Sequence, residues 1–223
     1  NMSQDAVFKD ILAYKEVLAH IMKTCVVEYR DCTIPEIMSY IENEPEVGQS
    51  GVHPDETNPP RIHGLATESS STTEDGKIGL IINIEAQGKY HPGYPLVKRA
   101  LYYCGRMLSA QYGSVFTQSH YEALRKVYSI WICSHPPLER ENTITSYAVE
   151  ERPLVGNVTE PVRHYDLLNV TMICLGSPEG ARYGGLLRML EVLFKGRCTP
   201  GQVIQILEEE YDFSSARNME GTV

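Results

Sequence analysis

The sequence predicts a single α/β domain in which helices pack against a central sheet. Two runs of strand length, residues 77–87 and 127–134, are almost continuously apolar, as neighbouring interior strands covered on both faces require. Two longer stretches, residues 5–29 and 94–111, repeat apolar residues at steps of three and four, which is typical of amphipathic helices. With 42% hydrophobic and 22% charged residues, the 223 residues can build one well-packed core, so residues 1–223 are expected to form one domain.

A helical segment is expected at the amino-terminal end, over about residues 5–43. The long helix at residues 5–29 is followed by a short helix after Thr33, because a proline and a glutamate there suit a first helical turn. Residues 44–76 contain four prolines and a tract of serine and threonine, so they predict a loop-rich excursion within the domain and its least ordered internal segment.

The core elements follow in order from residue 77. The first interior strand leads through a short turn into the helix at residues 94–111, and the second interior strand ends before a pair of prolines. Residues 143–151 alternate enough to form a third strand, whereas the apolar run at residues 164–176 fits either a strand or a helix. Two closing helices are predicted, at residues 183–194 and 200–211.

The bulk properties narrow the classes of function. No stretch approaches the ~18 consecutive apolar residues that a membrane span needs, and the first residues lack the basic start and apolar run of a signal peptide. A cytoplasmic protein with no membrane partner is therefore expected. None of the six cysteines forms a CxxC pair, which favours free thiols over disulfides or a zinc site.

The acidic net charge of the chain limits how it can bind a nucleic acid. The formal net charge of −9 disfavours a nonspecific polyanion binder. Such a chain can still bind DNA through a local basic patch, with metal ions offsetting the carboxylates of a site.

The motif Asn83-Ile84-Glu85-Ala86-Gln87 closes the first interior strand. Side chains alternate along a strand, so Glu85 and Gln87 are expected to project from one face and their apolar neighbours from the other. A carboxylate at a strand end is a good ligand for Mg²⁺, and a polar group two residues on can orient a water. Taken alone, the pattern more often marks a solvated residue at the rim of a sheet.

Longer segments around this motif resemble a known family. Residues 79–113 (GLIINIEAQGKYHPGYPLVKRALYYCGRMLSAQYG) and 120–137 (HYEALRKVYSIWICSHPP) are similar to the PD-(D/E)XK nuclease superfamily, in its branch of nuclease-family transposases, many of them uncharacterised bacterial proteins. The similarity continues through ENTITSY, YDLLNVTMICLGSPE and LLRMLEVL and covers most of the chain. The resemblance implies a restriction-endonuclease-like central mixed sheet flanked by helices. It also implies a DNA endonuclease, or phosphodiesterase, that depends on Mg²⁺ or Mn²⁺.

The resemblance also implies the site residues. In the family an Asp on one strand and a Glu on the next bind the metal, and in this branch Gln replaces the Lys that usually follows the Glu. Glu85 and Gln87 match that half as catalytic residues, with Glu85 on the metal. Glu68 matches a Thr-Glu loop of the family and is expected to supply a second metal carboxylate. The strand that carries the family's Asp has no counterpart before Lys77, and Asp75 lies in a turn-like context, so either that Asp is lost or a segment is missing between Gly76 and Lys77.

Positive charge follows the motif on the next helix, where Arg99 and Tyr103 are four residues apart and share a face. The spacing recurs in the family and implies that Arg99 binds a scissile phosphate, braced by Tyr103 and supported by Lys98. An equal alternative is that Arg99 packs beside core tyrosines without a substrate. Two functions thus stay open: a metal-dependent endonuclease, or a catalytically inactive binding or structural protein of the same fold.

Overall fold

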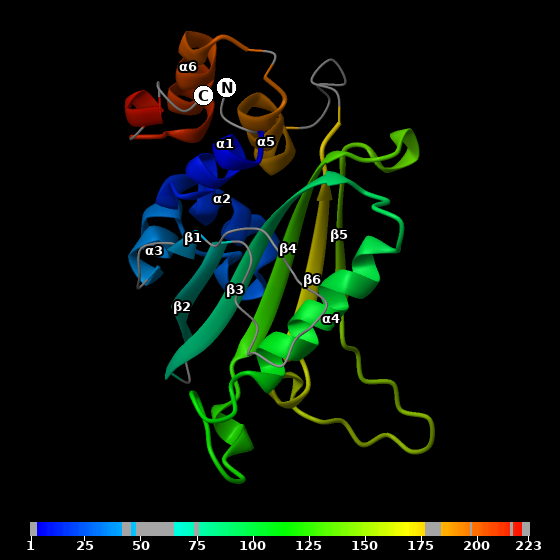
Figure 1. The fold of residues 1–223 in the computed structure, drawn as a ribbon. Helices are drawn as coiled ribbons and strands as arrows, with labels where there is room; N and C mark the ends of the chain where they lie inside the picture. The colour runs from blue at the N-terminus through cyan, green and yellow to red at the C-terminus, as the bar shows by residue number, and fades with distance from the viewer. Residues whose placement is uncertain are drawn as a thin grey trace.

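A six-stranded mixed sheet flanked by helices forms the centre of the computed structural model, which describes residues 4–41, 46–47, 65–73, 76–176, 184–196, 198–214 and 216–219 (Figure 1). The strands are β1 Glu46–Val47, β2 Leu65–Thr73, β3 Gly76–Lys89, β4 Lys126–His135, β5 Thr143–Ala148 and β6 Leu168–Cys174. The helices are α1 Gln4–Leu12, α2 Lys15–Cys25, α3 Ile34–Tyr40, α4 Leu96–Ser109, α5 Gly185–Phe194 and α6 Pro200–Tyr211.

The strand order is β1-β2-β3-β4-β6-β5, with β3, β4 and β6 parallel to one another and the outer strands antiparallel to their neighbours. The prediction that residues 77–87 and 127–134 form neighbouring interior strands is confirmed, because they lie in β3 and β4. The undecided run at residues 164–176 contains β6, whose residues from Asn169 to Cys174 are all buried. This run is a strand because it pairs with β4, and the sequence of the run alone could not reveal that pairing.

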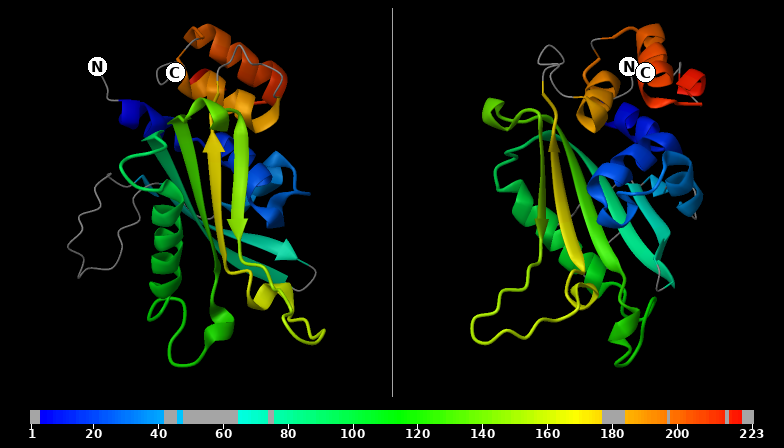
Figure 2. Two further views of the ribbon diagram at one scale, coloured as in Figure 1. Left: turned by 90° about the vertical axis from the view of Figure 1, so that its right-hand side faces the viewer. Right: turned by 180° about the vertical axis from the view of Figure 1, so that it is seen from behind.

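Helices cover the two faces of the sheet unequally (Figure 2). On one face Ile82 and Ile84 of β3 join a core with α1, α2, α5 and α6. On the other face Trp131 and Cys133 of β4 pack under α4. Each interior strand therefore buries both of its faces, which explains the continuous apolar runs in the sequence.

The amino-terminal helix differs from the prediction of one helix over residues 5–29, because α1 and α2 are separate. Tyr14 is extended (φ −76°, ψ 119°) and precedes the first turn of α2. Its hydroxyl donates to the carbonyl of Asn218 (3.0 Å), and in α1 the ring of Phe8 stacks on Phe194 at 3.9 Å. Both helices contribute to one core, with Ile11 from α1 and Leu18 from α2, so the apolar repeat continues across the break. The short helix predicted after Thr33 is α3, where Thr33 and Glu36 form a capping box.

The expected loop-rich excursion at residues 44–76 contains a strand that the sequence did not predict. β2 is a nine-residue strand in an antiparallel pair with β3, and Glu68 is opposite Ile81. Its serine and threonine residues lack the apolar alternation that is typical of a strand. The antiparallel pairing with the apolar β3 holds this segment in the extended conformation. Most of the remaining excursion, where low order was predicted, lies outside the described residues.

The cysteines in the described chain are free, as predicted, and Cys25, Cys104, Cys133 and Cys174 are buried. None of the helices in the described ranges combines the length and the apolar character needed to cross a bilayer.

A buried ionic network connects Lys126, at the start of β4, to the segment that follows α2 and to the segment that precedes β6. The ammonium group of Lys126, which is buried, contacts Glu28 Oε1 (3.2 Å) and Asp166 Oδ2. The Tyr128 hydroxyl donates to the other oxygen of Glu28 at 2.5 Å. Burial raises the pKa of Tyr128, and the charge of Glu28 adds to the effect, so this phenol stays protonated and remains a donor.

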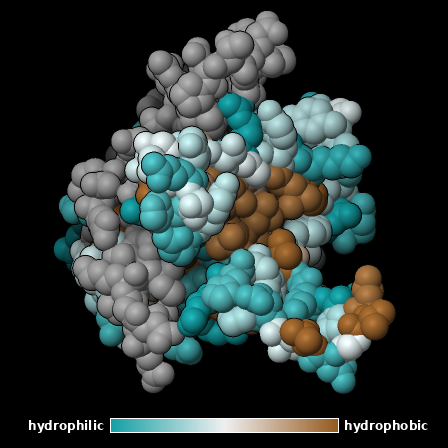
Figure 3. All heavy atoms as spheres, turned by 90° about the horizontal axis from the view of Figure 1, so that it is seen from below, coloured by the Kyte–Doolittle hydropathy of each residue, from teal (hydrophilic) through white to brown (hydrophobic). Residues whose placement is uncertain are grey.

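The connection between β5 and β6 projects from the body as an arm (Figures 1 and 2). At its base the backbone N–H of Glu160 donates to both carboxylate oxygens of Glu151 (3.0 and 3.1 Å). Leu154, Val155 and Val158 are 88%, 98% and 86% exposed. Apolar surface is visible at the edge of the molecule when it is viewed from this end (Figure 3). Three aliphatic side chains within five residues make the arm tip an exposed apolar surface.

Candidate functional site

Three polar side chains follow one another on the face of β3 that α4 covers. Asn83, Glu85 and Gln87 alternate with Ile82 and Ile84, which are buried on the opposite face. Across the parallel pairing their register partners on β4 are Ser129, Trp131 and Cys133. The predicted common face of Glu85 and Gln87 is therefore the face of the sheet under α4.

α4 positions Arg99 over this face. The guanidinium donates from Nε to the Tyr103 hydroxyl and from Nη1 to the Tyr94 hydroxyl, both at 3.0 Å. It also lies 5.2 Å from the ring centroid of Tyr103 and 5.3 Å from that of Trp131. Two phenols and an indole thus fix the plane of a half-buried cation.

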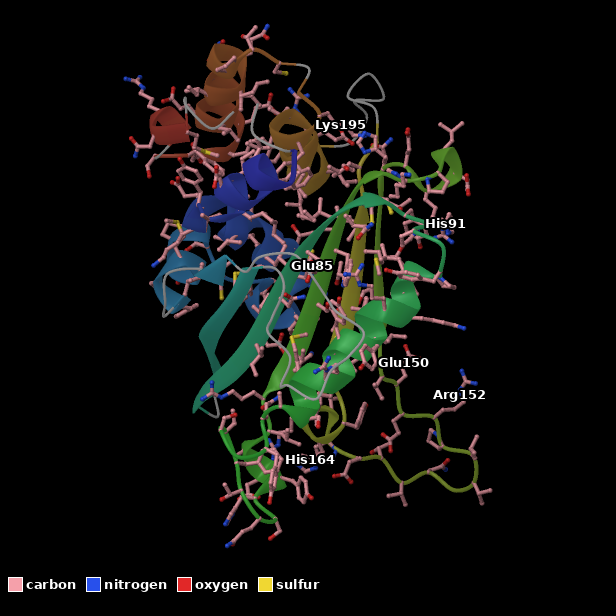
Figure 4. The ribbon with its side chains drawn as sticks, viewed as in Figure 1. Glu85, His91, Glu150, Arg152, His164 and Lys195 are labelled. Carbon is pink, nitrogen blue, oxygen red and sulfur yellow. The ribbon has the colours of Figure 1, made fainter. Side chains whose placement is uncertain are left out.

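Tyr103 lies within the electrostatic influence of both this cation and Glu85. Burial raises the pKa of Tyr103, the hydrogen bond from Arg99 opposes that rise, and the charge of Glu85 adds to it. A carboxylate and a guanidinium therefore act on one phenol, which stays protonated at neutral pH. Glu85 lies centrally over the sheet, whereas the labelled His91, Glu150 and His164 lie toward the periphery (Figure 4).

Asn83 is a member of the site that the sequence did not single out. It is 2% exposed, and its Oδ1 has no hydrogen-bond partner in the parts of the chain that the structure describes. A buried amide oxygen without a partner costs about 1–3 kcal/mol, so such atoms often mark a bound water, ion or ligand. The signal was present in the sequence, since Asn83 interrupts an apolar run two residues before Glu85.

The other predicted residues have different positions. Gln87 lies on the α4 face, and its Nε2 donates to the carbonyl of Lys89 at 2.9 Å. Lys98 is exposed on α4 beside Arg99. The register places Glu68 four residues from Glu85 along β3, which is about 13 Å at the rise of a strand. The structure therefore does not bring Glu68 next to Glu85, and Asp75 lies outside the described residues.

A metal ion at this site would have few protein ligands. Within the described ranges no three residues among His, Cys, Asp and Glu gather closely enough to hold an ion. Glu85 and the Oδ1 atom of Asn83 supply two oxygen donors on one strand face, and carboxylate and amide oxygens suit Mg²⁺ and Mn²⁺. Most of the remaining positions would have to be filled by water or by phosphate oxygens of a substrate, which is how Mg²⁺ commonly binds.

No family model, curated protein or solved structure matches the chain.

The bond between Arg99 and Tyr103 can be tested by the change Tyr103→Phe. We expect the free energy of unfolding to fall by about 1 kcal/mol, because the half-buried guanidinium loses a hydrogen-bond acceptor. Urea denaturation measures this change, and Tyr102→Phe is the matched control, since Tyr102 is 58% exposed on the same helix. Equal stability of the two variants would contradict a structural bond at Tyr103.

Proposed function

We propose that this protein is a metal-dependent DNA endonuclease of the PD-(D/E)XK type, related to the nuclease-family transposases. The observation that carries the proposal is that Arg99 lies over Trp131, the β4 register partner of Glu85, so that a cation and a carboxylate share the sheet face under α4. Phosphodiester hydrolysis needs a carboxylate that holds a divalent ion and a cation that holds the phosphate. The site offers both, with Glu85 on β3 and Arg99 on α4.

Each residue of the site has a distinct part in this proposal. Glu85, with the amide oxygen of Asn83, would hold Mg²⁺ or Mn²⁺, which supplies an activated water and offsets charge on the phosphate. Arg99 would bind a non-bridging phosphate oxygen, and Tyr103 would keep its guanidinium in place. Gln87 would orient the attacking water at the end of β3.

The fold gives general support to the proposal. A mixed sheet flanked by helices is what the resemblance implies, and we propose a restriction-endonuclease-like core built from β2, β3, α4 and β4. The same proposal includes DNA as the partner and the cytoplasm as the location.

A catalytically inactive DNA-binding or structural protein is the second candidate. Two observations favour it. Glu68, the expected second metal ligand, pairs with Ile81 and so lies four residues from Glu85 along β3, and the chain has a net charge of −9. In this case Arg99 would hold β3 and α4 together without a metal.

Plasmid cleavage distinguishes the two candidates. We expect supercoiled DNA to be nicked in the presence of Mg²⁺ or Mn²⁺, and Glu85→Ala to lower the rate at least about a hundredfold, or about 2.7 kcal/mol. Glu150→Ala, a change at an exposed residue away from the site, should cleave like the wild type. Cleavage that is unaffected by Glu85→Ala would remove the nuclease proposal, and DNA binding without any cleavage would support the second candidate.

A further inference from the structure

A second polar site lies on the face of the sheet opposite α4. A cavity of about 590 Å³ opens between α2 and the beginning of α5 and end of α6. Cavities that hold small ligands commonly measure about 300–1,000 Å³. Its walls combine basic and aromatic side chains, contributed by His20, Lys23, Arg30 and Tyr211.

The cavity carries an excess of positive charge in an acidic chain. Lys23 and Arg30 line it. The carboxylate that faces them belongs to Glu210, and both of its oxygens accept hydrogen bonds from Arg188 (2.6 and 2.7 Å). The charge of Glu210 is therefore compensated. Arg30 is exposed, and the ammonium of Lys23, which donates one hydrogen bond to the carbonyl of Cys32 (2.5 Å), has further N–H donors for an anion.

His20, whose side chain lines the cavity, also carries an unsatisfied polar atom. Its ring stacks on Phe213 at 5.3 Å and meets Tyr211 edge-on at 5.6 Å, so the ring plane is fixed. The Nε2 atom is shielded from solvent and has no hydrogen-bond partner among the residues that the structure covers. A shielded ring nitrogen of this kind is satisfied when a ligand or water reaches it.

The beginning of α5 strengthens the preference for an anion. Gly185 and Leu186, the first residues of this ten-residue helix, line the cavity, and helix amino termini attract negative charge. Gly185 has φ +64°, a conformation that glycine adopts without strain. Its carbonyl accepts a hydrogen bond from the Tyr211 hydroxyl (2.8 Å), which holds the aromatic wall beside the helix start.

We propose that this cavity binds a phosphate monoester attached to a planar ring, with Lys23 and Arg30 on the phosphate and the Tyr211 and His20 rings beside the base. Two sources share this chemistry: a free mononucleotide and the 5′-phosphorylated end of a nucleic-acid strand. The site is separate from Glu85 and does not depend on catalysis there.

Calorimetric titration of the full chain with deoxythymidine monophosphate tests this proposal. We expect binding of the monophosphate, no measurable binding of thymidine, and affinity at least about tenfold lower in Lys23→Gln/Arg30→Gln. His20→Phe, which keeps an aromatic ring but removes the nitrogen, should also bind more weakly. Arg152→Gln/Lys89→Gln is the charge-matched control, because both residues are exposed and neither lines the cavity, and it should bind like the wild type.

Short oligonucleotides with and without a 5′-phosphate identify the source. Tighter binding of the phosphorylated oligonucleotide than of the mononucleotide indicates a strand end, and the reverse order indicates a free nucleotide. The proposal is overturned if neither phosphate ligand binds at millimolar concentration, or if folded Lys23→Gln/Arg30→Gln binds as tightly as the wild type. Circular dichroism confirms that each variant is folded.

Discussion

Replacing Lys126 with methionine is expected to lower the free energy of unfolding by about 3–5 kcal/mol. The ammonium group of Lys126 is buried between the carboxylates of Glu28 and Asp166. Methionine fills a similar volume but leaves two carboxylates close together with little solvent and no cation between them. The loss therefore comes from uncompensated charge, and chemical denaturation followed by circular dichroism measures it.

Two further variants separate charge from packing at this position. Lys89→Met removes an exposed lysine from the end of β3 and should change stability by less than about 0.5 kcal/mol. Combining Lys126→Met with Glu28→Gln and Asp166→Asn should recover part of the loss, because the unpaired charges are then gone. A single Lys126→Met variant as stable as the wild type would contradict a buried ionic network at the start of β4.

Replacing Trp131 with alanine is expected to lower the free energy of unfolding by about 3–5 kcal/mol. Trp131 is fully buried under α4, and its indole Nε1 donates to Ser129 Oγ at 2.8 Å. Its ring centroid also lies 5.7 Å from that of Tyr103 and 5.3 Å from the guanidinium of Arg99. Removing the ring would leave a cavity beneath the residues that hold the cation of the site.

Trp131→Phe is the graded control for this effect. It keeps an aromatic ring under Arg99 but loses the hydrogen bond to Ser129 and some buried area, so its loss of stability should be smaller than that of Trp131→Ala. Denaturation curves of both variants, with near-ultraviolet circular dichroism of the aromatic residues, give the comparison. A loss below about 1 kcal/mol in Trp131→Ala would show that α4 does not depend on this residue.

The strands at the centre of the fold could be predicted because burial on both faces requires apolar residues at consecutive positions, which are visible in the sequence. β3 and β4 are covered on both faces, and each appears as a nearly continuous apolar run. β6 is buried in the same way, but its shorter run fits a helix equally well until pairing with β4 is known. β2 was missed because its serine and threonine residues are held by antiparallel pairing with β3, which local composition does not reveal.

The site could be predicted only in part, for a similar reason. The two-residue spacing of Glu85 and Gln87 predicted that they share one face of the strand. The four-residue spacing of Arg99 and Tyr103 predicted that these two side chains lie together, and they form a hydrogen bond. Tyr94 and Trp131 were missed as partners of Arg99. The role of Trp131 depends on the register between β3 and β4 and on the docking of α4, both of which are non-local.

Binding of Mn²⁺ is the decisive test of the proposed function, because that function requires an ion at Glu85. Electron paramagnetic resonance can follow a Mn²⁺ titration of the wild type, Glu85→Gln and the control Glu150→Gln, each with and without a short DNA duplex. We expect Mn²⁺ binding to be strengthened by DNA, because phosphate oxygens would complete the ligands, and to be lost in Glu85→Gln alone. Equal binding by the wild type and Glu85→Gln, or no binding by the wild type even with DNA, would contradict a metal site at Glu85.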